Sequence, residues 1–164
     1  MRVGDLERSA PPLLADAMLG KLARWLRALG YDTLYLQVDD AEIAHRARVE
    51  SRVVLTQDRQ LARRRGLRTV LIMSQDLAQQ VEEVIAAVGK PPVDCARCMV
   101  CNGALERISH DDAAKQVPVY VAATQEVFRR CIECGRIYWQ GTHWDGIRER
   151  IARVLTVGHG AGLG

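Results

Sequence analysis

The sequence predicts an α/β fold in which a parallel sheet is flanked by helices, followed by a smaller region that carries the cysteines. From Leu13 to Val88, short apolar runs alternate with helical patterns, and this alternation is typical of a parallel sheet. The pattern changes at Lys90-Pro91-Pro92, and all five cysteines follow that point. With 164 residues, of which 48% are hydrophobic and 26% charged, the chain can bury a core.

Each predicted strand in the first region, which spans residues 13–90, is followed by a predicted helix. The expected strands are Leu13 to Ala15, Thr33 to Leu36, Arg52 to Thr56 and Leu67 to Met73. The expected helices run from about Leu19 to Leu29, Ala41 to Val49, Arg59 to Arg65 and Asp76 to Val88. Gly30, Gly66 and Gly89 follow three of these helices, as expected for residues that end a helix in a left-handed conformation. Residues 1–12 are expected to be flexible.

Four of the cysteines form two pairs, and two residues separate the members of each pair. The pairs are Cys98 with Cys101 and Cys131 with Cys134. Two thiolates on one tight turn can occupy two corners of a tetrahedron, which is the geometry of a structural zinc site. Metal ligands are favoured over disulfides because the chain starts without a secretion signal. The sequence therefore predicts a four-cysteine zinc ribbon over residues 91–141, with reduced, partly buried thiols as the alternative.

The residue after each pair decides which cysteines are chosen. Cys95 is also separated by two residues from Cys98. A tight metal turn is expected to leave through a residue that tolerates positive φ. Asn102 and Gly135 follow the chosen pairs, whereas Met99 would follow the competing pair. Cys95 is therefore expected to be the spare cysteine.

The rest of the second region is expected to form ribbon strands and one helix. The apolar run Val117 to Ala122 and the run Ile137 to Trp139 are predicted to be strands of the ribbon. Thr142 with an acid three residues later predicts the start of a helix from about His143 to Leu155, within a segment 142–156 that packs back on the body. Residues 157–164 contain four glycines and are expected to be disordered.

The distribution of charged residues along the chain indicates a polyanionic partner more clearly than the net charge does. The formal net charge is only +3, but between Ala44 and Arg68 eight arginines and two acids give a local surplus of +6. A solvated arginine-rich surface is the alternative. The apolar runs are far shorter than the roughly 20 residues that cross a bilayer. We therefore expect a cytoplasmic protein without a membrane-spanning helix.

Acidic residues follow three of the predicted strands. Asp16 directly follows the first strand, Asp39 and Asp40 follow the second, and Asp58 lies two residues past the third. Because ligands of parallel sheets bind outside the carboxyl ends of the strands, we expect these carboxylates at one rim. Such a cluster suits Mg²⁺ or Mn²⁺, which can activate water for phosphodiester hydrolysis. The predicted chemistry is that of a nuclease.

Helix capping explains each of these acids separately. Aspartate between a strand and a helix is a favoured N-cap, and Asp39 with Glu42 fits a capping box. Capping alone does not explain why three acids are expected at one rim, and this shared location favours a metal site over a capping role alone. Lys21, Arg24 and Arg27 lie three apart on the first helix, where they can contact phosphates or form a solvated basic stripe.

Several stretches of the chain carry the motifs of a known family. They are Leu14 to Arg27, Leu29 to Thr33, Arg52 to Arg59, and the two cysteine pairs with the run Gly135 to Trp144. Over about residues 13 to 155, they resemble the RNase family named after the C-terminal domain of the Mut-seven exonuclease. The resemblance implies a PIN-like nuclease fold with clustered acids and a divalent metal, carrying a zinc ribbon. It also implies metal-dependent RNA cleavage, with Asp16, Asp40 and Asp58 at the acidic positions.

These observations combine into one expected function, a PIN-like metal-dependent ribonuclease. Asp16, Asp40 and Asp58 are expected to hold Mg²⁺ or Mn²⁺, with Asp39 and Asp76 as further ligands. The expected RNA contacts are Lys21, Arg24, Arg27, Arg59, Arg63, Arg64 and Arg65, and the zinc ribbon is expected to extend that surface. One alternative is a non-catalytic RNA-binding or ribosome-binding zinc-ribbon module whose acids are helix caps. A second is a toxin-like nuclease controlled by a partner protein.

Overall fold

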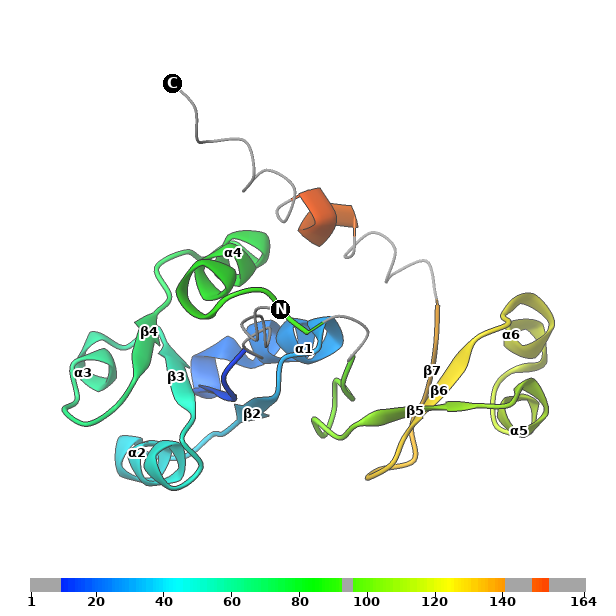
Figure 1. Ribbon diagram of the computed structural model, residues 1–164, viewed down its shortest axis with the longest axis horizontal. Helices are drawn as coiled ribbons and strands as arrows, with labels where there is room; N and C mark the ends of the chain where they lie inside the picture. Colours follow the sequence, from blue (N-terminus) through cyan, green and yellow to red (C-terminus); the bar gives the residue numbers. More distant parts are fainter. Residues whose placement is uncertain (1–9, 93–95, 141–148, 154–164) are drawn as a thin grey trace, which may run out of the picture. The chain divides into compact units, whose positions relative to one another are not determined.

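Figure 1 shows a computed structural model of the chain, which describes residues 10–92, 96–140 and 149–153. The chain divides into two compact units, one ending at Asn102 and the other beginning at Gly103. Of the predicted C-terminal helix, residues 149–153 are helical, whereas its predicted start and the predicted disordered tail lie outside the described residues. None of the helices in the described ranges is long and apolar enough to cross a membrane.

A parallel sheet forms the centre of the first unit, as predicted. Its strands are β1 (Leu13–Ala15), β2 (Thr33–Tyr35), β3 (Val53–Thr56) and β4 (Thr69–Leu71), in the order β2-β1-β3-β4. Every residue of the two central strands, β1 and β3, is buried. Their sequences, LLA and VVLT, are continuous apolar or β-branched runs rather than alternating ones, because helices cover both faces of the sheet.

Helices follow each strand and cover the two faces of the sheet (Figure 1). They are the 3-10 helix η1 (Ala17–Leu19) and the α-helices α1 (Gly20–Leu29), α2 (Asp40–Val49), α3 (Arg59–Ala62) and α4 (Leu77–Val88). Leu13 and Ala15 of β1 pack with residues of α1 and α4, whereas Leu14 packs with residues of α2 and α3. The predicted α/β architecture is confirmed.

The predicted third helix is longer than the observed one. The structure ends α3 at Ala62, and Arg63, Arg64 and Arg65 follow it as exposed residues. None of these arginines offers an apolar side chain that would hold another helical turn against the sheet. The exposed arginines therefore lie in a connection that ends at Gly66, whose φ is +75°.

The first unit continues past the Lys90-Pro91-Pro92 boundary that the sequence predicted. Arg97 donates its backbone N–H to the backbone oxygen of Arg27 at 2.8 Å. Thr33 donates its backbone N–H to Asn102 Oδ1 at 3.0 Å. These hydrogen bonds hold the segment that carries the first cysteine pair against α1 and the start of β2, so the compact unit ends only at Asn102.

The second unit contains an antiparallel sheet of three strands and two short helices. The strands are β5 (Leu105–Ile108), β6 (Phe128–Cys131) and β7 (Ile137–Trp139), in the order β5-β6-β7. The helices α5 (His110–Ala114) and α6 (Val119–Thr124) lie between β5 and β6 in the sequence. Figure 1 shows them next to each other at one end of this sheet.

The prediction of a strand over Val117 to Ala122 is wrong, because α6 occupies most of this run. Pro118 precedes the helix as its N-cap, and its fixed φ suits a helix start. Val121 is buried in an apolar cluster with Ala113 and Phe128, whereas Val119 is 87% exposed. A continuous apolar run does not distinguish a strand from a short helix, and here packing on Phe128 favours the helix.

Candidate functional site

Acidic residues follow all four strands of the parallel sheet. Asp16 follows β1, Asp40 begins α2 beyond β2, Asp58 caps α3 beyond β3, and Asp76 caps α4 beyond β4. Because the strands are parallel, these positions share the carboxyl edge of the sheet. The strand order places Asp16 and Asp58 beyond the ends of the two central strands, with Asp40 and Asp76 beyond the outer strands on either side.

Asp16 is the buried member of this group, with only 7% of its surface exposed. Its Oδ1 accepts a hydrogen bond from the backbone N–H of Met18 at 3.2 Å, and its Oδ2 accepts one from the hydroxyl of Thr56. The same Thr56 oxygen accepts a hydrogen bond from the backbone N–H of Asp58 at 2.9 Å. Thr56, which is fully buried, thus links Asp16 on β1 to Asp58 beyond β3.

Three of the exposed aspartates at this edge are helix caps. Asp58 Oδ1 accepts hydrogen bonds from the backbone N–H groups of Gln60 and Leu61, at 2.7 and 3.4 Å. Asp39 and Asp76 cap α2 and α4 in the same way, also through Oδ1. In all three, the capping hydrogen bonds involve Oδ1, so the second carboxylate oxygen is available to a cation. Capping and metal binding are therefore compatible roles for these residues.

The structure does not gather the predicted acids into a compact cluster. Across the described residues, no three of these acids place one oxygen each within 4.8 Å of one another. Thr56 links the carboxylate of Asp16 to the backbone of Asp58, whereas Asp40 is an exposed residue at the start of α2. The oxygen donors suit Mg²⁺, which commonly binds through one or two carboxylates and keeps several waters.

The predicted basic residues differ in their surroundings. Lys21 and Arg24 are exposed on α1, and Arg59, Arg63, Arg64 and Arg65 are exposed beyond Asp58. Arg27 is instead only 6% exposed, and its Nε donates to the backbone oxygen of Thr33 at 2.8 Å. Its Nη1 donates to the backbone oxygens of Met99 and Val100, at 2.9 and 3.2 Å. These contacts give Arg27 a structural role, and the RNA contacts proposed below do not include it.

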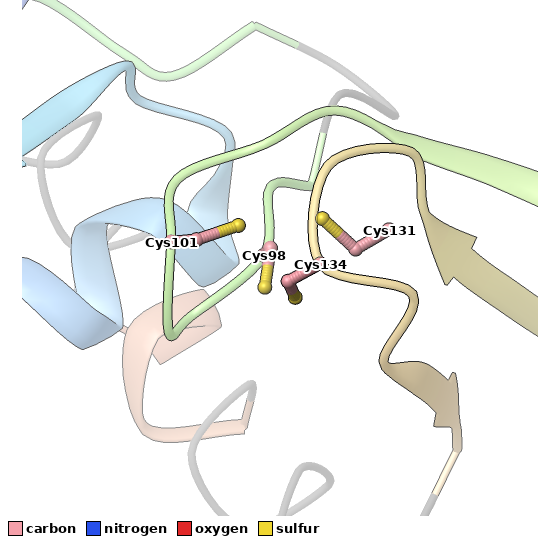
Figure 2. A group of neighbouring side chains, drawn as sticks. All are labelled: Cys98, Cys101, Cys131 and Cys134. Atoms are coloured by element: carbon pink, nitrogen blue, oxygen red, sulfur yellow. The ribbon is translucent and has the colours of Figure 1, made fainter.

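The four predicted cysteines form a second group, shown in Figure 2. The sulfur atoms of Cys98, Cys101, Cys131 and Cys134 all lie within 4.8 Å of one another. Cys98 and Cys131 are buried, whereas the other two are exposed. A tetrahedral zinc site with Zn–S bonds of about 2.3 Å needs sulfurs that are all close neighbours. The group is suited to a metal ion such as zinc, while Cys95 lies outside the described residues.

The turns that carry these cysteines have the backbone that the sequence predicted. The backbone oxygen of Cys98 accepts from the N–H of Asn102 at 2.9 Å, and that of Cys131 accepts from the N–H of Gly135 at 3.0 Å. Asn102 has a φ of 68° and Gly135 a φ of 76°, which confirms the preference for residues that tolerate positive φ. A Cβ at Gly103 would lie 2.7 Å from the sulfur of Cys131, so the first turn requires a glycine there.

A polar network attaches the first cysteine turn to the amino edge of the parallel sheet. Asn102 Nδ2 donates to Asp32 Oδ1 at 2.7 Å, and Arg52 Nη1 donates to the same oxygen at 2.9 Å. Arg52 also donates to the backbone oxygen of Leu13 at 3.0 Å. Burial opposes the ionisation of Asp32, but the hydrogen bonds from Arg52 and Asn102 and the charge of Arg52 hold its pKa below its usual value.

This network was not predicted from the sequence. Asn102 was singled out only for its tolerance of positive φ, and neither Asp32 nor Arg52 lies at a spacing that indicates a partner. The contact between Asn102 and Asp32 joins residues 70 positions apart, and no local pattern encodes such a contact. The network lies at the edge opposite the acids, because Asp32 precedes β2 and Asp16 follows β1.

Comparison with known families finds the Mut7-C RNAse domain over residues 11–151. No curated protein and no solved structure matches the chain. The matched residues include the parallel sheet, the acids of its carboxyl edge and all four clustered cysteines. Because this match covers most of the sequence, the chain belongs to the Mut7-C RNAse domain family, which points to a nuclease.

Proposed function

We propose that the chain is a PIN-like, metal-dependent ribonuclease that hydrolyses RNA phosphodiester bonds at the carboxyl edge of its parallel sheet. The observation that carries the proposal is the environment of Asp16, a carboxylate that is 7% exposed and has no ion pair with any described residue. Burying an unpaired charge costs several kcal/mol, so such a group is expected to have a cationic ligand. A divalent cation bound by Asp16 would supply that charge.

Asp16 and Asp58 are the proposed principal ligands, with Asp40 completing the site and Asp39 and Asp76 within reach of the same edge. A divalent cation held there would neutralise the carboxylates and activate water for attack on the phosphate. The hydroxyl of Thr56 donates to Asp16 Oδ2 and thereby fixes the orientation of this carboxylate. Asp58 keeps its capping hydrogen bonds through Oδ1 and offers its second oxygen to the cation.

RNA is the proposed substrate, and exposed cations near this edge are the proposed backbone contacts. Lys21 and Arg24 lie on α1, the helix that follows Asp16 and η1. Arg59, Arg63, Arg64 and Arg65 lie on α3 and the connection after it, beyond Asp58. Lysine and arginine contacts to phosphates bind RNA without reading its sequence. We further propose that the four cysteines bind structural zinc and that this ribbon assists RNA binding.

Cleavage assays on the purified chain and its Asp16→Asn variant test the proposal. End-labelled single-stranded and structured RNAs are incubated with Mg²⁺, with Mn²⁺ or without added divalent ion. We expect metal-dependent cleavage by the unmodified chain and none by the variant. Glu82→Gln is the matched control, because it removes an exposed acid of α4 that is not at this edge. Intact RNA binding without cleavage by either protein would instead favour the non-catalytic binding module whose acids are caps.

A further inference from the structure

The antiparallel sheet of the second unit places three cationic or aromatic side chains in one row. Arg107 of β5 is in register with Arg129 of β6, and Arg129 is in register with Tyr138 of β7. Residues in register on neighbouring strands point to the same face of a sheet. The three side chains therefore form a row across all three strands, which we call the Arg107 row.

The opposite face of this sheet has a different role. Ile108, Phe128 and Trp139 are also in register, and they belong to the apolar cluster that includes residues of α5 and α6. On the same face, Arg130 Nη2 lies 2.6 Å from Glu106 Oε1 in an ion pair. The apolar residues of this face pack in the cluster with the helices, and its charged residues balance each other.

The Arg107 row carries positive charge that no described residue balances. Arg107 is exposed and Arg129 is half-buried, and no carboxylate of the described residues forms an ion pair with either. Tyr138, a half-buried residue, is in register with Arg129. Two neighbouring arginines attract a polyanion, and an aromatic side chain beside them can stack on an unpaired base.

We propose that the Arg107 row binds single-stranded RNA, with Arg107 and Arg129 contacting backbone phosphates and Tyr138 stacking on a base. Strands of a sheet lie about 4.8 Å apart, so the row spans about 10 Å and fits a short stretch of nucleotides. Stacking requires bases that are not paired in a duplex, which selects single strands or loops. The proposal rests on the proposed function for its choice of RNA as the polyanion.

The charge contribution is tested by fluorescence anisotropy with a labelled single-stranded RNA over a series of salt concentrations. All proteins carry Asp16→Asn so that the RNA stays intact. Each lost phosphate contact is expected to lower the slope of log affinity against log salt by about 0.7, which is about fivefold in affinity at 0.1 M salt. The double variant Arg107→Gln/Arg129→Gln should therefore bind about 25-fold more weakly and with a slope smaller by about 1.4.

The control for the face of the sheet is Glu106→Gln/Arg130→Gln, which removes the ion pair of the opposite face. It should bind RNA as tightly as the parent protein, because its net charge is the same. Equal weakening in both double variants would overturn the proposal, as would an unchanged slope in the Arg107 row variant. Circular dichroism and zinc content confirm that each variant is folded.

Stacking is tested separately at Tyr138. Loss of one stacked base costs about 1–3 kcal/mol, so Tyr138→Ala should weaken binding roughly 5- to 150-fold. Tyr138→Phe keeps the ring and should bind like the parent. Equal affinities of these two variants for unstructured RNA would contradict stacking. If the unmodified chain fails to cleave RNA while these binding differences appear, the proposed nuclease function is wrong, but the proposal that the Arg107 row binds RNA is supported.

Discussion

Asp32 at the amino edge of the parallel sheet and Asp16 at the carboxyl edge both adjoin a strand of that sheet, yet their surroundings differ. Asp32 accepts hydrogen bonds from Arg52 and from Asn102 through one oxygen. Asp16 is more deeply buried, and from the described residues its side chain accepts hydrogen bonds only from a backbone N–H and the Thr56 hydroxyl. The first carboxylate is neutralised by the protein itself, whereas the second has no cationic partner among the described residues.

This difference distinguishes a structural carboxylate, Asp32, from the carboxylate that we propose to be functional, Asp16. A buried charge with its own cation contributes to the fold, and removal of that cation or carboxylate destabilises the protein. A buried charge without a cation lowers stability, and such a cost is common where a residue serves function. The amino edge thus holds the first cysteine turn in place, while the carboxyl edge is the proposed reaction site.

The largest expected effect on the amino edge comes from removing a zinc ligand. Cys98→Ser should abolish stoichiometric zinc binding and lower the melting temperature by about 10 °C or more, because structural zinc contributes many kcal/mol to folding. Metal analysis and thermal unfolding measure the two effects. Cys95→Ser is the control, since the spare cysteine should leave both unchanged. A full equivalent of zinc in Cys98→Ser would refute this ligand set.

Replacing Arg27 tests whether the amino edge supports the cysteine turn. Arg27→Gln loses the guanidinium that donates to the backbone oxygens of Met99 and Val100. We expect a loss of about 3 kcal/mol in unfolding free energy, because partly buried carbonyls lose a charged donor, together with weaker zinc retention against a chelator. Arg24→Gln, on the exposed face of the same helix, is the matched control. Equal zinc retention in both variants would show that Arg27 does not support the cysteine turn.

A smaller and pH-dependent effect is expected at Asp32. Its pKa is held below the usual value in the folded protein, so its ionised form stabilises the fold at pH values above its unfolded pKa of about 3.9. That contribution is lost as the pH falls from about 4 through the folded pKa. Asp32→Asn should cost about 1.5 kcal/mol at pH 7.

Chemical denaturation of the unmodified chain and Asp32→Asn at pH 7 and near pH 3.5 measures this difference. Comparing the two proteins at each pH cancels the loss of zinc that acid causes in both. The stability gap should narrow at the lower pH. A gap of constant size would show that the charge of Asp32 has no part in the network.

The smallest effect on stability is expected at the carboxyl edge. Asparagine caps helices as well as aspartate, so Asp58→Asn should change the unfolding free energy by less than about 0.5 kcal/mol. Its cleavage rate should nevertheless fall by at least about a hundredfold. Thermal unfolding and the cleavage assay give the two values. Unchanged cleavage with normal folding would show that Asp58 is only a helix cap and not a metal ligand.

The features that the sequence predicted are those encoded by local patterns. The buried strands β1 and β3 are continuous apolar runs, and the cysteine turns have fixed spacing with Asn102 and Gly135 behind them. Helix α6 was mistaken for a strand because a short apolar run fits both. The side-chain contacts of Arg27 with Met99 and of Asn102 with Asp32 could not be predicted, since they join residues 72 and 70 positions apart.

The candidate site was predicted in part for the same reason. Strand ends locate Asp16, Asp40, Asp58 and Asp76 at one edge, because the sheet is parallel. The distances between these carboxylates depend on loop conformations, and the compact cluster expected from three acids is not formed. The burial of Asp16 and its hydrogen bond to Thr56 appear only once β1 and β3 are neighbours.

The most direct test compares Asp16→Asn with Asp32→Asn in both stability and cleavage. Removing the charge of Asp16 should abolish cleavage, because a proposed metal ligand is lost. It should leave the melting temperature unchanged or raise it, because a buried charge without a cation destabilises the fold. Removing the charge of Asp32 should lower the melting temperature while leaving cleavage by the remaining folded protein intact. The contradictory result is an Asp16→Asn variant that cleaves RNA normally and unfolds at a lower temperature, since Asp16 would then be a structural residue.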